Sequence, residues 1–402
     1  MPILIKGGKV FTGGKLIDAH ILIEKGKIKK ISKRKLPADN IIKAKGKIIL
    51  PGLIDCHVHM REPGMIAKEN FYTGSEAAVA GGVTTVLDMP NTKPPTFTVQ
   101  DMIKKRTLAE KSVVNYGFYM GTLGNNLDEI AKARNLAGVK VYMDKTTGKL
   151  MVTSDKKLLK IFNSHQLVAV HAEGATLNKA MAIMKKTNNR LYVCHVSTAK
   201  ELSIISKYKR KFKGRLFCEV TPHHLFLTNK DVRRLKGYGM MRPALGSPVD
   251  QKALWRAVKS GLIDTVATDH APHTLKEKKK SNPPMGVPGL ETMLPLLLDA
   301  INKRKFTFKQ LVKMTSENPA KIFNIKNKGM IKEGYDADLV IVDMKKIAEV
   351  KNKKLFTKCK WSPFNRMKLK GWPIYTFVNG ILIFENGKIN LTKNLARGEV
   401  HE

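Results

Sequence analysis

The chain has 402 residues, of which 43% are hydrophobic, so it can form two ordinary domains or one large barrel with an appendage. It contains no run of about 18 apolar residues, and its first residues lack the apolar core of a signal peptide, so we expect neither a membrane span nor export. The four cysteines are far apart and form no Cys-x-x-Cys pair, which predicts a reduced, cytoplasmic protein without zinc fingers.

The formal net charge of +40 comes from lysines that are scattered along the whole chain. Such a charge can steer an anionic small substrate, or it can contact an acidic partner or a nucleic acid. Few of the basic clusters contain the interleaved aromatic residues that a nucleic-acid platform needs. We therefore favour a solvated, lysine-rich surface and do not expect nucleic-acid binding.

Residues 1–48 alternate apolar and polar positions between glycines, which predicts short strands joined by tight turns. The same alternation returns in residues 333–402, where Asn379-Gly380 and Asn386-Gly387 are typical hairpin turns. We expect these two terminal segments to form the two parts of one small β-sandwich.

Between the terminal segments, residues 49–332 contain apolar, β-rich runs that alternate with helical patterns. The runs cover residues 47–59, 83–89, 113–120, 139–143, 167–172, 191–196, 216–220 and 264–268. Continuous apolar runs separated by helices are typical of a parallel sheet that is buried on both faces. Eight such units match the size of a (β/α)8 barrel, so the chain is predicted to be an α/β protein with a TIM-like barrel.

Metal-ligating side chains stand at the carboxyl ends of five of these runs, where a barrel of this kind builds its active site. They are His57, His59, Lys140, His171, His195 and Asp269. His57 and His59 are two residues apart, so on a strand both imidazoles point to the same face. Two histidines on one strand, two single histidines, a lysine and an aspartate predict a hydrolase with two metal ions.

Lys140 is the unusual member of this set, because a protonated lysine repels cations. Burial favours the neutral amine, which can react with carbon dioxide to give an anionic carbamate that bridges two metals. The alternative is a lysine at the end of a strand that pairs with Asp144 or Glu173. The residues alone do not decide between these two interpretations. Asp269 can ligate a metal and can also carry a proton to the leaving group.

Five longer motifs are specific to one family. They are residues 51–64 (PGLIDCHVHMREPG), 88–95 (DMPNTKPP), 218–224 (CEVTPHH), 267–278 (ATDHAPHTLKEK) and 289–295 (GLETMLP). With these motifs the chain resembles the dihydroorotases, metal-dependent amidohydrolases of pyrimidine biosynthesis, over residues 47–390.

The resemblance implies two zinc ions that are bridged by carboxylated Lys140 and a hydroxide. The implied ligands are His57, His59, Lys140 and Asp269 for one ion, and Lys140, His171 and His195 for the other. Some relatives have an aspartate at the bridging position, so Asp144 competes with Lys140, although the following Tyr142 favours the carboxylated-lysine branch. Some relatives also bind a further metal near the positions of Glu219 and His224, where we prefer a packed strand end.

Substrate contacts are implied in the same way. Arg61, Asn91 and His273 match positions that hold a substrate carboxylate, for which the planar guanidinium of Arg61 is suited. Arg242, Met285 and Gly286 match positions that contact the ring, and Thr146 and Thr147 match a loop that covers the substrate.

The implied reaction is the reversible cyclisation of N-carbamoyl-L-aspartate to (S)-dihydroorotate and water, with a metal-bridging hydroxide and with Asp269 as the proton shuttle. Another cyclic amidohydrolase, of the allantoinase or dihydropyrimidinase type, is the nearest alternative, but its ring lacks the carboxylate that Arg61 and Asn91 suit. An inactive homologue that acts as a scaffold is disfavoured, because it would be expected to have lost metal ligands. The resemblance also raises an aspartate transcarbamoylase as a partner. The sequence predicts no oligomeric state.

Overall fold

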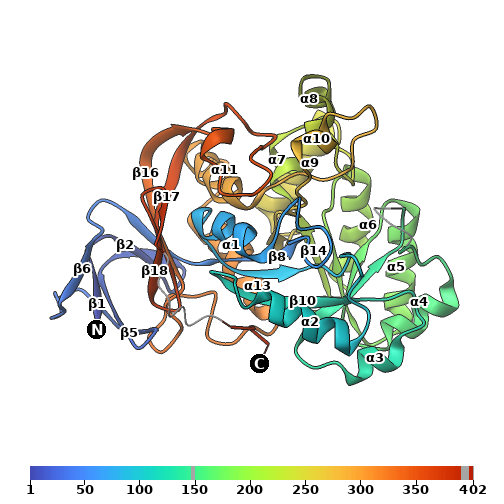
Figure 1. Ribbon diagram of the computed structural model, residues 1–402, viewed down its shortest axis with the longest axis horizontal. Helices are drawn as coiled ribbons and strands as arrows, with labels where there is room; N and C mark the ends of the chain where they lie inside the picture. The colour runs from blue at the N-terminus through green and yellow to red at the C-terminus, as the bar shows by residue number, and fades with distance from the viewer. Residues whose placement is uncertain (146–149, 391–397, 402) are drawn as a thin grey trace.

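The computed structural model describes residues 1–145, 150–390 and 398–401. Its centre is a parallel sheet in which every strand lies beside its neighbour in the sequence (Figure 1). The strands are β8 (Leu53–Val58), β9 (Val83–Asp88), β10 (Asn115–Gly121), β11 (Leu136–Tyr142), β12 (Leu167–His171), β13 (Arg190–Val193), β14 (Leu216–Val220) and β15 (Thr265–Val266). A parallel bridge between Val58 and His270 connects the two edges, so the sheet closes into the predicted (β/α)8 barrel.

Helices connect the barrel strands and follow the last of them along the chain (Figure 1). They are α1 (Phe71–Ala80), α2 (Val99–Ala109), α3 (Leu127–Lys132), α4 (Asp155–Phe162), α5 (Ala175–Lys186), α6 (Ala199–Lys209), α7 (Pro222–Phe226), α8 (Asn229–Leu235), η1 (Lys236–Gly239), α9 (Pro248–Ser260), α10 (Leu275–Lys278), α11 (Leu290–Asn302), α12 (Phe308–Val312), η2 (Lys313–Glu317) and α13 (Asn318–Ile322). Several begin at a capping box, and in α10 the hydroxyl of Thr274 accepts from the N–H of Glu277 while the Glu277 carboxylate binds the N–H of Thr274.

The terminal segments form the predicted sandwich, at the left of Figure 1. One sheet contains β1 (Ile3–Lys6), β4 (His20–Glu24), β5 (Lys27–Ser32) and β6 (Asn40–Lys43). The other sheet contains β2 (Lys9–Thr12), β3 (Lys15–Asp18), β7 (Ile48–Pro51), β16 (Leu339–Glu349), β17 (Lys368–Val378), β18 (Ile381–Glu385) and β19 (Lys388–Ile389). Ile5, Ile21, Ile341 and Phe377 belong to the buried core that the two sheets share.

Each of the eight predicted runs overlaps a barrel strand, although β10, β11 and β13 extend beyond their runs and the first run divides. Its residues up to Pro51 form β7, which pairs with β16 in the sandwich, and its residues from Leu53 form β8 in the barrel. Gly52 marks the division, because a side-chain carbon there would lie 2.2 Å from the hydroxyl oxygen of Thr84.

Thr146 and Thr147, which were predicted to belong to a loop over the substrate, lie outside the described residues. Within the part of the chain that the structure covers, none of the helices combines the length and the apolar character that crossing a membrane requires.

Candidate active site

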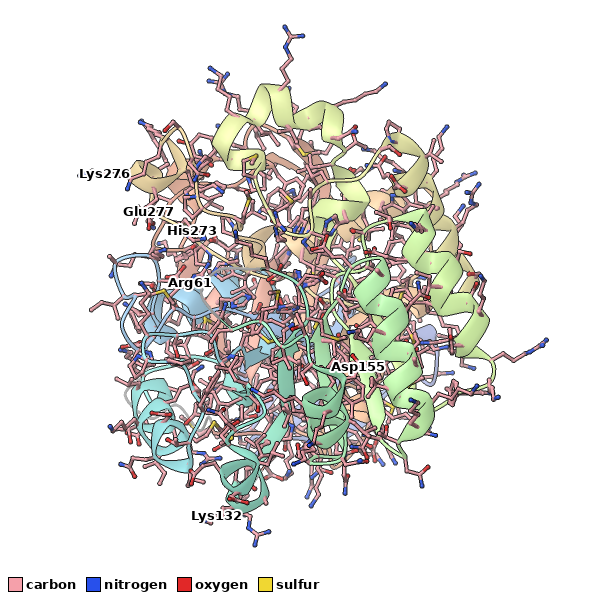
Figure 2. All side chains as sticks on the ribbon, turned by 90° about the vertical axis from the view of Figure 1, so that its right-hand side faces the viewer. Arg61, Lys132, Asp155, His273, Lys276 and Glu277 are labelled. Carbon is pink, nitrogen blue, oxygen red and sulfur yellow. The ribbon has the colours of Figure 1, made fainter. Side chains whose placement is uncertain are left out.

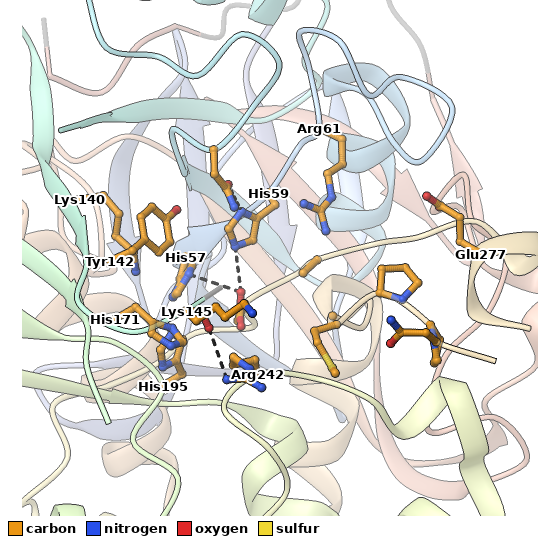
Figure 3. Close-up of a pocket in the computed structure, with 18 of the residues that line it drawn as sticks. His57, His59, Arg61, Lys140, Tyr142, Lys145, His171, His195, Arg242 and Glu277 are labelled. Atoms are coloured by element: carbon orange, nitrogen blue, oxygen red, sulfur yellow. Dashed lines mark hydrogen bonds and ion pairs between the residues drawn. The ribbon is translucent and has the colours of Figure 1, made fainter. Parts of the chain in front are cut away.

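A cavity of about 660 Å³ opens at the carboxyl ends of the barrel strands (Figure 3). The structure brings all six predicted metal ligands to its surface, together with five of the six predicted substrate contacts. These eleven residues are His57, His59, Arg61, Asn91, Lys140, His171, His195, Arg242, Asp269, Met285 and Gly286. A cavity of this size suits a small ring compound.

His57 and His59 both approach the carboxylate of Asp269 with the Nε2 atom of the imidazole ring. Their Nε2 atoms lie 3.4 Å and 3.0 Å from Oδ1 of Asp269. Each Nδ1 faces outward, His57 to Glu219 Oε1 at 2.8 Å and His59 to Asn91 Oδ1 at 2.7 Å. A histidine that donates its Nδ1–H to such an oxygen directs a lone pair from Nε2, so two lone pairs and a carboxylate oxygen converge where a cation would fit.

His171 and His195 form the second half of the cluster. Nδ1 of His171 and Nε2 of His195 are 2.9 Å apart, which is near the roughly 3.3 Å between two nitrogen ligands on one tetrahedral zinc ion. The other ring nitrogen of His171 lies 3.0 Å from Glu173 Oε1, which fixes the ring. His195 is buried, and among the described residues its Nδ1 has no hydrogen-bond partner, a costly state for a polar atom without a ligand or water.

Ligand atoms of His57, His195 and Asp269 all lie within 4.8 Å of one another, so the two halves meet at one point. Burial acts against the charged form of His57, yet Glu219 and Asp269 together raise its pKa to about 10, so a metal ion that binds Nε2 would replace a proton there. Burial likewise acts against the Asp269 carboxylate, but His57 and His59 hold its pKa well below the usual range. The donor set of imidazoles with an ionised carboxylate fits zinc.

Lys140 lies in β11 with 1% of its surface exposed and faces the cavity. Its Nζ is 2.9 Å from Sγ of Cys194, and within the described residues no ion pair joins it to Asp144 or Glu173. Asp144 does not line the cavity; its carboxylate accepts from the N–H of Glu173 at 2.8 Å and from the hydroxyl of Thr176. Of these two residues, Lys140 is therefore the one whose side chain reaches the cavity.

Arg61 follows the two histidines and is also buried, with 4% of its surface exposed. Its Nε donates to the carbonyl of Pro272 at 3.1 Å, and one terminal nitrogen lies 3.2 Å from Nε2 of His273. These contacts hold the guanidinium at the cavity surface, where Figure 3 shows it beside His59.

His273 is the one predicted substrate contact that does not line the cavity. It lies behind Arg61, with Nε2 2.9 Å from the carbonyl of Met285 and Nδ1 3.0 Å from Nζ of Lys68. Burial and the charges of Arg61 and Lys68 lower its pKa to about 2, so the ring is neutral. In this structure His273 supports the cavity surface from behind.

Glu219 and His224, the candidates for a further metal, are both engaged with protein groups. Glu219 accepts from His57, from the backbone N–H of His195 and from the hydroxyl of Tyr192. Nδ1 of His224 contacts the hydroxyl of Thr221 at 2.7 Å, and its Nε2 contacts the carbonyl of Pro243 at 3.1 Å. These contacts favour the packed strand end, and they give Glu219 a role that the sequence did not predict, which is to hold the ring of His57 and the backbone of His195. In the sequence, the position of Glu219 at the end of the seventh apolar run could have indicated that it lies close to the other polar residues of the site.

Comparisons with known proteins show the family of the chain. The Amidohydrolase family profile matches residues 48–383. A dihydroorotase from Methanosarcina acetivorans is 38% identical over 100% of this chain and 96% of its own length, and one from Pyrococcus horikoshii is 40% identical over 96% and 93%. The solved structure of L-hydantoinase (dihydropyrimidinase) from Arthrobacter aurescens superposes with a TM-score of 0.93 at 29% identity, covering 99% of this chain and 98% of that one.

The chain is therefore an enzyme of the amidohydrolase family, built on a (β/α)8 barrel with its polar cluster at the carboxyl rim. Within that family it belongs with the dihydroorotases, as the five sequence motifs predicted.

Proposed function

We propose that this enzyme is a dihydroorotase, which interconverts N-carbamoyl-L-aspartate and (S)-dihydroorotate with release or uptake of water. The observation that carries the proposal is a buried guanidinium, Arg61, that shares one cavity with the histidine and aspartate cluster. A ring that bears a carboxylate satisfies both parts of the cavity, and the full-length relatives are named dihydroorotase.

Two zinc ions are the proposed cofactor, held by the four histidines, Asp269 and a carboxylated Lys140. When bound, zinc supplies a Lewis acid for the ring carbonyl and lowers the pKa of water toward 7. The protein orients the ligands from behind, since Glu219 and Asn91 fix the Nδ1 atoms of His57 and His59.

Asp269 is the proposed proton carrier. In the hydrolytic direction a water oxygen bonds to the ring amide carbon, the C–N bond breaks, and Asp269 passes the water proton to the departing ureido nitrogen. In the biosynthetic direction the ureido nitrogen attacks the carbon of a protonated carboxyl group and gives its proton to Asp269, which passes it to the departing hydroxyl, so that water leaves. Arg61 binds the substrate carboxylate throughout, and His273 keeps Arg61 in place from behind.

The second candidate is a cyclic amidohydrolase of the dihydropyrimidinase type, which the solved hydantoinase structures favour at the level of the fold. Hydrolysis of dihydroorotate, dihydrouracil and allantoin, measured on one sample with its zinc content, separates the candidates. We expect much faster turnover of dihydroorotate than of dihydrouracil or allantoin, and close to two zinc ions per chain. Faster turnover of an uncharged ring would overturn the proposal. A cytoplasmic location and association with an aspartate transcarbamoylase stay predictions.

A further inference from the structure

Lys278 is one of the largest fully buried side chains of the protein, although the sequence places it in a run of surface lysines. It closes the short helix α10 with 1% of its surface exposed, whereas Lys276, Lys279 and Lys280 are exposed. Figure 2 shows Lys276 at the outer edge of the molecule, with His273 further in. The run therefore contains one lysine whose environment differs from that of its neighbours.

The amine of Lys278 binds three backbone carbonyls. Its Nζ donates to the oxygen of Met240 at 3.0 Å, of Pro284 at 2.8 Å and of Gly286 at 2.9 Å. An ammonium group has three protons and no acceptor, so three carbonyls match it completely. Burial, and next the charge of Arg61, lower the pKa of Lys278 to about 7, although the charge of Glu277 acts in the opposite direction.

Two of the three carbonyls, those of Pro284 and Gly286, belong to the part of the cavity surface that we call the ring-side wall, residues 283–286. All four residues of this wall line the cavity. The carbonyl of Met285 binds His273, and the N–H of Gly286 donates to Met240 at 3.0 Å, so successive peptide groups of the wall are held by groups behind it. Gly286 has φ of 132°, and a side-chain carbon there would lie 2.6 Å from the carbonyl of Ala271, so the wall has little room to shift.

A second segment supports Lys278 from the other side. The ring of Trp361, which is fully buried, has its centroid 5.4 Å from Nζ of Lys278, a cation–π contact. The indole N–H donates to the carbonyl of His273 at 2.7 Å. Lys278, His273 and Trp361 thus form one buried layer between the ring-side wall and the segment that follows β16.

We propose that Lys278 is a positioning residue for substrate binding, which holds the ring-side wall at the distance that the substrate ring requires. For its choice of substrate this inference rests on the proposed dihydroorotase function. The metal-ligand candidates lie at the ends of β8, β11, β12, β13 and β15, and Lys278 contacts none of them among the described residues. Loss of the amine is therefore expected to change the Michaelis constant and to leave the turnover number and the metal content in place.

The test compares Lys278→Met with Lys276→Met, which makes the same change on an exposed position of the same helix. Both are assayed at 0.15 M salt, where a surface charge is screened beyond about 8 Å. We expect the Michaelis constant for dihydroorotate to rise about tenfold or more in Lys278→Met, as the loss of buried hydrogen bonds implies, with turnover within about threefold. Lys276→Met is expected to behave as the wild type.

Hydrogen exchange of the peptide that contains residues 284–287 gives a readout that needs no activity. We expect faster exchange in Lys278→Met and unchanged exchange in Lys276→Met. If the wild-type enzyme fails to hydrolyse dihydroorotate, the proposed function fails, and the exchange measurement alone decides the role of Lys278.

A Michaelis constant within about twofold of the Lys276→Met value would overturn the inference, and a lowered melting temperature alone would assign Lys278 to stability. If Lys278→Met does not fold, Lys278→Arg is compared with Lys276→Arg. The longer guanidinium keeps the charge and displaces the wall, so the Michaelis constant is again expected to rise, and an unchanged value again overturns the inference.

Discussion

Replacement of Arg61 by methionine tests the part of the site that distinguishes a dihydroorotase from other cyclic amidohydrolases. Methionine keeps most of the length of the side chain and removes the charge and every donor. In the protein the guanidinium is buried, and its Nε and one terminal nitrogen already contact Pro272 and His273. The remaining N–H groups would donate hydrogen bonds to a substrate carboxylate.

The expected size of the effect follows from these contacts. A hydrogen bond between charged groups contributes about 1.5–3 kcal/mol, which corresponds to about 10–150-fold in the Michaelis constant for dihydroorotate. The loss also leaves the carbonyl of Pro272 without its donor, so we expect the free energy of unfolding to fall by about 1–3 kcal/mol. Activity must therefore be measured per folded, zinc-loaded enzyme.

Dihydrouracil, which has the same ring without the carboxylate, is the substrate control, and Lys280→Met is the protein control. Lys280 lines the cavity and is exposed, so this variant loses the same charge without a buried contact. We expect its Michaelis constant to change by less than about threefold at 0.15 M salt. If Arg61→Met reduces activity on dihydrouracil as much as on dihydroorotate, Arg61 is structural and the argument from the carboxylate is wrong.

Three further variants test the metal cluster and the surface charge. Lys140→Ala is expected to lose activity and most of one metal equivalent, with partial restoration by a short carboxylic acid; full activity would rule out the carbamate. Asp269→Asn is expected to keep near-normal metal content while turnover falls about 10²–10⁴-fold, the range for a positioned proton carrier, and unchanged turnover would leave Asp269 as a ligand only. Replacement of Lys276, Lys279 and Lys280 by glutamine is expected to flatten any fall of kcat/KM with ionic strength, since the Debye length shortens from about 30 Å at 0.01 M to about 8 Å at 0.15 M. A flat salt dependence in the unmodified enzyme would show that these lysines do not steer the substrate.

The barrel was predictable because its physical signals are local. A strand that is buried on both faces needs a continuous apolar run, and each of the eight runs overlaps a different barrel strand. The ligand candidates were predictable for the same reason, since a polar residue that ends such a run lies at the rim. The division of the first run at Gly52 was missed, because both halves are equally apolar and only the close contact with Thr84 separates them.

What surrounds the ligands was not predictable, because those contacts join distant parts of the chain. Glu219 reaches His57 across 162 residues, and Trp361 reaches His273 across 88. Lys278 has the same sequence context as the exposed lysines beside it. Only the folded chain shows that three carbonyls accept hydrogen bonds from its amine.

The buried cations also explain how the cavity can prefer an anionic ring. Arg61 and Lys278 are both buried, and after burial itself the charge of Arg61 lowers the pKa of Lys278 to about 7, so near neutral pH Lys278 is charged in about half of the molecules. Two like charges in a weakly screened site repel each other, and a bound carboxylate offsets that repulsion whereas an uncharged ring does not. The exposed lysines that make up most of the +40 charge are screened by salt, so they contribute little to this preference. The selectivity of the site is therefore expected to persist at high ionic strength, in which only the encounter rate falls.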